Sequence, residues 1–122
     1  MATMRYLVHD VGASLSFYVD GPGFQQVQVF GPAMAIVRRD DLTLWLAGPT
    51  ASAARPMPDG RMPEPGGWNR VVIEVDDLDE RIAALGSAGV VFRNEVVEGP
   101  GGRQILAEDP SGNVVELFEP VS

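Results

Sequence analysis

Residues 5–24 read RYLVHDVGASLSFYVDGPGF, and residues 71–90 read VVIEVDDLDERIAALGSAGV. In both stretches an apolar run ends in Val-x-Asp, an amphipathic segment begins at the aspartate (Asp10 or Asp77), and a glycine follows. An aspartate at this point can cap the first turn of a helix, so each stretch predicts a strand followed by a helix. Such a repeat within 122 residues predicts two copies of one supersecondary unit, which pack together to bury a core and leave a concavity where they meet.

The sequence on either side of the two stretches completes each unit. The first unit has a helix of about 10 residues after Asp10, and its strands are expected at residues 4–8, 24–30, 33–38 and 42–47. The second has a helix at 78–88, and its strands are expected at 70–76, near 91–97, at 103–108 and at 113–119. We therefore predict an α+β fold of two tandem β-α-β-β-β modules, in one domain made of residues 1–47, a connecting loop at 48–68 and residues 69–122.

The length and composition of the chain limit the classes of protein to which it can belong. With 122 residues, 45% of them hydrophobic, the chain matches one domain with a real core. No apolar run has the length of a membrane helix and no signal segment is evident, so we expect a cytoplasmic protein without membrane contact. The nine cations are scattered arginines in a chain of net charge −8, which argues against nucleic acid as a partner.

The segment 48–68 contains five prolines among Gly and Ala, so regular structure is not expected there. It is either a linker or a functional loop. Met57 and Met62 flank the turn at Asp59 and Gly60, and their soft thioethers would suit an apolar lid over a ligand. The alternative is that both are simply exposed loop methionines.

Two motifs resemble a known family. Val8-x-Asp10 followed by Ser14 to Tyr18 and Gly23-Phe24 resembles the opening of the vicinal oxygen chelate superfamily, which includes glyoxalase I, extradiol dioxygenases and bleomycin-resistance proteins. The sequence DPSGNVVELF at 109–118 is similar to the closing signature of that superfamily. The resemblance implies two modules whose sheets curve around a shared cleft, often in a homodimer, and the cleft could lie within one chain or between two exchanged chains.

In enzymes of this superfamily, four side chains from the first and last strands of the modules hold a divalent metal. Carried onto this sequence, the four positions are Thr3, Trp45, Arg70 and Glu116. Only Glu116 matches a carboxylate ligand, because threonine is a poor ligand, tryptophan offers only an N–H donor and arginine brings a fixed positive charge. We therefore expect no metal and no cofactor.

Strand register identifies further candidate residues for a ligand site. Leu42, Leu44 and Leu46 should face the helix, which leaves Trp45 in the cleft as a stacking platform for a planar ligand; the alternative is a core tryptophan. Trp68 could clamp the same ligand or only anchor the loop. Arg70 and Glu116 could pair with each other or contact the ligand. The other candidates are Phe30, Thr43 and Phe118 as lining residues, and Arg5 and Gln104 as weaker polar contacts.

These observations predict a metal-free, non-catalytic homodimer that sequesters an aromatic or polycyclic small molecule, as members of the antibiotic-binding resistance branch do. One alternative is a metal-dependent lyase, isomerase or dioxygenase of the same fold. Another is a cofactor-independent enzyme in which Glu116 or His9, the single histidine, acts as acid or base. A third is a regulatory or scaffold domain with no small ligand.

Overall fold

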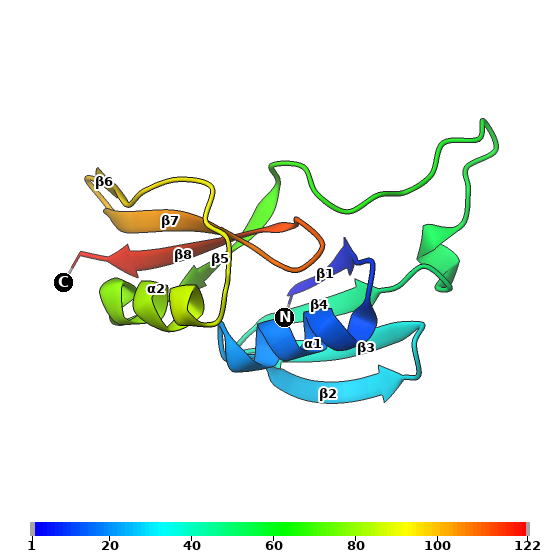
Figure 1. Cartoon of the computed structure of the whole chain (residues 1–122), viewed down its shortest axis with the longest axis horizontal. Helices are drawn as coiled ribbons and strands as arrows, with labels where there is room; N and C mark the ends of the chain where they lie inside the picture. Colours follow the sequence, from blue (N-terminus) through cyan, green and yellow to red (C-terminus); the bar gives the residue numbers. More distant parts are fainter. Residues whose placement is uncertain (1, 122) are drawn as a thin grey trace.

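The computed structural model describes residues 2–121 and consists of two modules with the same order of elements (Figure 1). The first module contains β1 (Ala2–Leu7), α1 (Val11–Asp20), β2 (Gln25–Phe30), β3 (Met34–Arg39) and β4 (Leu42–Ala47). The second contains β5 (Arg70–Glu74), α2 (Leu78–Ser87), β6 (Val97–Gly99), β7 (Gly102–Glu108) and β8 (Val114–Pro120). The predicted pair of β-α-β-β-β modules is confirmed.

Each module forms its own mixed, four-stranded sheet. The strand orders are β1-β4-β3-β2 and β5-β8-β7-β6, so the first strand of a module lies at one edge beside its last strand. The pairs β1–β4 and β5–β8 are parallel, whereas the remaining pairs are antiparallel. A parallel pair needs a crossover connection, and in both modules the helix begins that connection after the edge strand.

The repeated aspartates cap the two helices as predicted. Asp10 Oδ1 accepts from the Ala13 N–H at 2.9 Å, and Asp77 Oδ1 accepts from the Glu80 N–H at 3.0 Å. Each aspartate thus satisfies one of the N–H groups that the first turn of a helix leaves without an intrahelical partner. The first helix ends at Gly21, whose N–H donates to the Phe17 carbonyl at 2.8 Å.

One hydrophobic core joins both modules. Tyr18, Leu44 and Leu46 from the first module and Leu78 and Leu117 from the second are fully buried members of a single cluster. The predicted register is confirmed for β4, because Leu44 and Leu46 lie in this core while Trp45 between them is only partly buried. Because residues alternate between the faces of a strand, Trp45 lies on the face of the sheet turned away from α1.

One strand prediction is wrong in position. The strand expected near 91–97 is limited to Val97–Gly99, and before it only an isolated bridge pairs Phe92 with Ala107. The Asn94 side chain accepts from the Leu106 N–H at 3.0 Å, in place of a backbone carbonyl of a regular strand. This side-chain acceptor lets residues 91–96 follow β7 without forming a regular ladder.

Two buried tyrosines connect the modules through hydrogen bonds. The Tyr6 hydroxyl of β1 accepts from the Val71 N–H at 2.9 Å and donates to the Val114 carbonyl at 2.9 Å. The Tyr18 hydroxyl of α1 donates to Asp109 Oδ2 at 2.8 Å. Burial raises the pKa of Tyr6 to about 12, and burial together with the Asp109 carboxylate raises the pKa of Tyr18 as well.

The turn at 109–113 makes the other half of this junction. Buried Asp109 also accepts from the backbone N–H groups of Ser111 and Asn113, both at 2.9 Å. The Asn113 amide donates to the Leu7 carbonyl at 2.7 Å and accepts from the Gly66 N–H at 2.8 Å. The motif that resembles the family's closing signature therefore contacts β1, α1 and the connecting loop.

Candidate ligand-binding site

Each sheet has one face covered by its helix and one face turned away from it, which we call the open face. In the first sheet the register partners Thr3 and Thr43, and Arg5 and Trp45, lie on the open face. In the second, Val72 pairs with Glu116 and Gln104 pairs with Phe118 on the equivalent face. The predicted site residues on strands therefore occupy the two open faces.

On the first open face, Trp45 lies under an arginine. The Arg5 guanidinium is 4.9 Å from the centroid of the Trp45 ring, a cation–π contact between register partners on β1 and β4. Thr43 is buried two residues before Trp45 on β4, and Arg38 of β3 donates to the Thr43 hydroxyl at 3.4 Å. Phe30 lies at the end of β2 with 48% of its surface exposed.

On the second open face, Arg70 and Glu116 form an ion pair. Nε and Nη2 of Arg70 both lie 3.0 Å from Oε1 of Glu116, and the two side chains are 30% and 10% exposed. The Arg70 guanidinium also donates to the Trp68 carbonyl at 3.4 Å. Phe118 and Gln104 complete the group of predicted residues on this face.

The four positions that the resemblance assigns to a metal site carry side chains that do not fit a divalent ion. Thr3 and Trp45 supply no strong donor, and Glu116 is already engaged by the positive charge of Arg70. Within residues 2–121 no group of three or more His, Cys, Asp or Glu side chains is arranged to hold a metal ion. His9 is exposed on the turn before α1, where its backbone N–H donates to the Ser111 hydroxyl at 2.8 Å.

The connecting segment places the remaining predicted residues apart from these faces. It contains a short 3₁₀ helix, η1 (Ser52–Ala54), and then extends away from both sheets (Figure 1). Met57 and Met62, 43% and 55% exposed, lie at its far end. A turn there is closed by the Met57 N–H donating to the Arg61 carbonyl at 2.8 Å.

Arg93 is a residue of this region that sequence reasoning missed. Its guanidinium lies 4.4 Å from the centroid of the Trp68 ring, while Nε is 2.7 Å from Glu108 Oε2. Its other nitrogens donate to the Gly67 carbonyl at 2.8 Å and the Gly112 carbonyl at 3.0 Å. Arg93 thus attaches the end of the loop to the second module. The residues on either side of Arg93 were expected to form a strand, and they give no sign of this contact.

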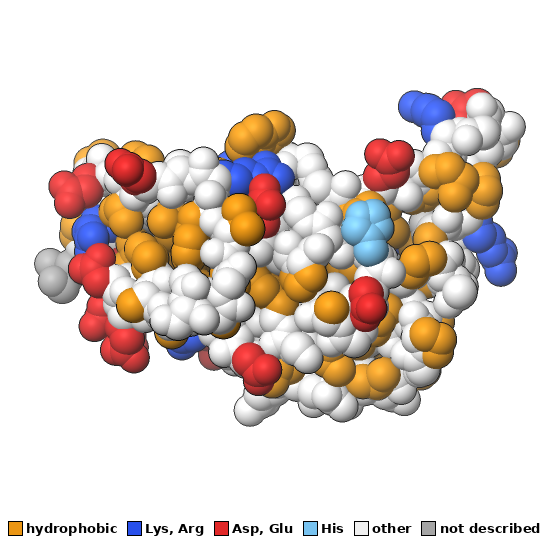
Figure 2. Space-filling model, viewed as in Figure 1, with side chains coloured by type: hydrophobic (Ala, Val, Ile, Leu, Met, Phe, Trp, Pro, Cys, Tyr) orange, Lys and Arg blue, Asp and Glu red, His pale blue; other side chains and the backbone are white. Residues whose placement is uncertain are grey.

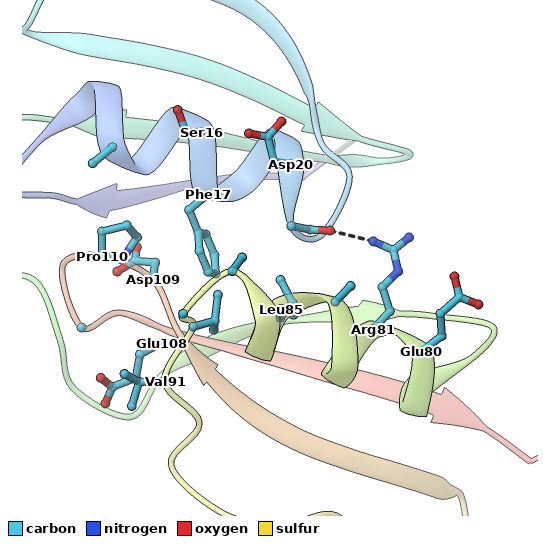
Figure 3. Close-up of a pocket in the computed structure, with 17 residues that line it drawn as sticks. Ser16, Phe17, Asp20, Glu80, Arg81, Leu85, Val91, Glu108, Asp109 and Pro110 are labelled. Carbon is cyan, nitrogen blue, oxygen red and sulfur yellow. Dashed lines mark hydrogen bonds between the residues drawn. The ribbon is translucent and has the colours of Figure 1, made fainter.

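A cavity of about 690 Å³ on the helix side was also not anticipated. It lies between α1 and α2, with Phe17 and Leu85 on its walls and the turn at Asp109 and Pro110 at one end (Figure 3). At the other end Arg81 Nη1 donates to the Gly21 carbonyl at 2.7 Å. None of the residues predicted for the ligand site lines this cavity.

Residues 1–117 match the family model described as the glyoxalase/bleomycin resistance protein/dioxygenase superfamily. The chain belongs to this superfamily. No match was found among curated proteins. The described part of the chain contains no helix that is both long and apolar enough to cross a membrane.

Solved structures of the superfamily resemble the chain over almost its whole length. A superfamily member from Sphaerobacter thermophilus has 27% identity and a TM-score of 0.75, covering 98% of this chain and 95% of that one. TnmS3, an antibiotic-binding protein from Streptomyces sp. CB03234, has 27% identity and a TM-score of 0.72, covering 98% and 93%. Lactoylglutathione lyase from Agrobacterium tumefaciens has 21% identity and a TM-score of 0.73, covering 98% and 92%, and this likeness concerns the fold alone. The superfamily fold thus occurs in both an enzyme and a binding protein.

Proposed function

We propose that this protein is a cytoplasmic homodimer that binds and sequesters an aromatic natural product, such as an antibiotic, without metal or cofactor and without changing it. The observation that carries the proposal is the side-chain set at the four metal-ligand positions of the superfamily. There, Arg70 pairs with Glu116 at 3.0 Å, and an indole takes the place of a carboxylate at Trp45. The chemistry of this donor set suits stacking and hydrogen bonding better than coordination.

The proposed contacts follow from the two open faces. Trp45 would stack against a flat ring of the ligand, with Phe30 and Phe118 adding apolar surface and Thr43 and Gln104 adding polar groups. Trp68 is 67% exposed and rests on Arg93 at 4.4 Å, so its free side is available to a ligand. Met57 and Met62 would close over the ligand from the connecting segment. The identity of TnmS3 as an antibiotic-binding protein supports this class of ligand.

A fluorescence screen tests the proposal. Aromatic antibiotics are titrated into the wild-type protein and into Trp45→Ala. Trp68→Phe is the matched variant, because it keeps Trp45 as the single tryptophan. We expect quenching by at least one compound, retention of that quenching in Trp68→Phe, and a loss of affinity of at least tenfold, about 1.4 kcal/mol, in Trp45→Ala. Equal affinity of the Trp45→Ala variant would contradict the stacking site.

Two further measurements separate binding from catalysis. Protein purified without chelators is analysed for Ni, Zn, Fe and Mn, and a ligand from the screen is recovered after long incubation and checked by mass spectrometry. We expect no stoichiometric metal and an unchanged ligand. Stoichiometric metal would favour a lyase, isomerase or dioxygenase, and a consumed ligand would favour an enzyme that uses Glu116 or His9.

A further inference from the structure

Charge is distributed unequally between the two sheets. The four strands of the first sheet contain Arg5, Arg38 and Arg39 and no acidic residue, although the chain has 17 acidic residues and a net charge of −8. The strands of the second sheet, in contrast, contain five acidic residues, Glu74, Glu98, Glu108, Glu116 and Glu119. The inequality concerns the strands of the sheets and not the whole surface, because the side of the molecule shown in Figure 2 carries acidic side chains over both halves.

Two of the three arginines in the first sheet lie on its open face. Arg5 shares that face with its register partner Trp45, and Arg38 with its register partner Thr43. Both arginines are exposed, and within residues 2–121 neither forms an ion pair. Arg39 points to the other side, where it donates to the Pro22 carbonyl at 3.1 Å and lies 3.6 Å from the Asp40 carboxylate.

The guanidinium groups of Arg5 and Arg38 lie on the same surface as the Trp45 ring. Arg5 lies over the indole ring at 4.9 Å, and Arg38 lies beside Thr43, about 7 Å along β4 from Trp45 at the usual rise of a strand. Asp40 and Asp41 are the acidic residues nearest to Arg38 and Trp45 in the sequence, and they lie in the turn beyond the end of β3. An aromatic platform thus lies between two guanidinium groups that form no ion pair with a carboxylate within residues 2–121.

We propose that the first open face selects an anionic aromatic compound, a flat ring system that carries a carboxylate or an ionised phenol. This inference rests on the proposed function, because it names the ligand class of the same site. The ring packs against Trp45, and the anionic group accepts hydrogen bonds from Arg5 or Arg38, whose planar guanidinium groups match a carboxylate in two-point geometry. An amine on the same ring would meet two positive charges and no carboxylate on this face.

Calorimetric titration with three naphthalene derivatives tests the charge preference. The probes are 2-naphthoate, neutral 2-naphthamide and cationic 2-naphthylmethylamine, which share one ring system and differ in charge. We expect naphthoate to bind about tenfold more tightly than the amide at low salt, since exposed charges contribute modestly, and the amine to bind most weakly. The preference should shrink in high salt, because a salt solution screens exposed charges.

Variants assign the preference to the two arginines. In Arg5→Gln/Arg38→Gln, we expect the ratio of the naphthoate and naphthamide affinities to fall from about tenfold to nearly one. Arg55→Gln is the matched control, since Arg55 is exposed on the connecting segment, and it should retain the full preference.

The possible outcomes separate the two proposals. Equal or tighter binding of the amide or amine by the wild-type protein overturns the charge preference and leaves the proposed function in place. A naphthoate preference that persists in the double variant overturns the assignment to Arg5 and Arg38. Absence of binding by all three probes, together with no quenching in the antibiotic screen, overturns both.

Discussion

Of the four positions that the family resemblance assigns to a metal site, Glu116 alone carries a carboxylate. Glu116 is 7% exposed, and two nitrogens of Arg70 each lie 3.0 Å from its Oε1 atom. A carboxylate with so little solvent needs a partner, because burying an unpaired charge is unfavourable. The Arg70 guanidinium supplies that partner.

Removing one partner of this pair should destabilise the protein more than removing both. We expect Arg70→Gln to lower the free energy of unfolding by about 1–2 kcal/mol, less than for a fully buried pair because Arg70 is 30% exposed. Denaturant unfolding of Arg70→Gln, Glu116→Gln and the double variant measures this in a cycle. Additive effects of the two single variants would show that the pair contributes no coupling.

The two tyrosines predict how stability changes at high pH. The pKa of Tyr6 is raised to about 12 by burial, so the folded state keeps this proton while the unfolded chain loses it near pH 10. The stabilisation from the neutral hydroxyl is therefore complete below pH 10 and is lost as the pH rises from about 10 to 12. For Tyr6 alone, we expect a loss of about 1.4 kcal/mol between pH 9 and pH 11.

Urea unfolding from pH 9 to 11 with tyrosine absorbance at 295 nm measures this loss directly, since Tyr6 and Tyr18 are the two tyrosines of the chain. Tyr6→Phe removes one titrating group and should lose less stability over the same range, although it starts less stable. A tyrosinate signal at pH 10 in the fully folded protein would contradict the predicted shift.

At the scale of elements, local sequence signals identified helices well and irregular segments poorly. Asp10 and Asp77 cap the helices because a short acidic side chain reaches the N–H of the third residue on, a purely local interaction. The segment 91–96 was predicted as a strand because its apolar residues resemble one. Its conformation instead depends on Asn94 and Arg93, which bond to β7 and to Gly67 and Gly112, contacts that no local pattern reveals.

Arg93 should control the order of the connecting segment near Trp68. We expect Arg93→Ala to lower the free energy of unfolding by about 1–2 kcal/mol, since it removes hydrogen bonds made by a charged group to the exposed Gly67 carbonyl and the partly buried Gly112 carbonyl. Amide hydrogen exchange should rise at residues 66–68, and Trp68 fluorescence in a Trp45→Phe background should shift to longer wavelength.

Arg61→Ala is the matched control for this segment. Arg61 pairs with Asp59 at 2.8 Å within the far turn, and its side chain is 84% exposed. We expect its loss to leave exchange at residues 66–68 and global stability unchanged. Unchanged exchange in Arg93→Ala as well would mean that Arg93 does not attach the segment.

At the scale of the whole molecule, the duplication and its register predicted the architecture, while the junction between the modules did not follow from the repeat. The hydroxyls of Tyr6 and Tyr18 and the side chain of Asn113 join parts of the chain about a hundred residues apart, and nothing in their local sequence gives their partners. For the candidate site, register alone placed Trp45 and Glu116 on open faces. The pairing of Arg5 with Trp45 needed the alignment of β1 with β4.

The apolar residues of the open faces lead to a prediction about assembly. Phe30 and Val72 on the open faces are 48% and 51% exposed, and exposed apolar side chains of this size can mark a contact surface for another protein copy. If the first open face of one copy meets the second open face of another, Val72 lies in the interface. We therefore expect the wild-type protein to sediment at twice the chain mass of 13.1 kDa at micromolar concentration, and Val72→Arg to sediment as a monomer.

Val121→Arg supplies the control, because Val121 is 66% exposed beyond the end of β8 and should keep the wild-type mass. Where the site is shared between copies, a bound ligand stabilises the dimer by mass action, so saturating ligand should lower the dimer dissociation constant and Val72→Arg should lose ligand affinity. A Val72→Arg monomer that binds as tightly as the wild-type protein would place the whole site within one chain. A wild-type protein that sediments as a monomer with ligand bound would rule out the homodimer.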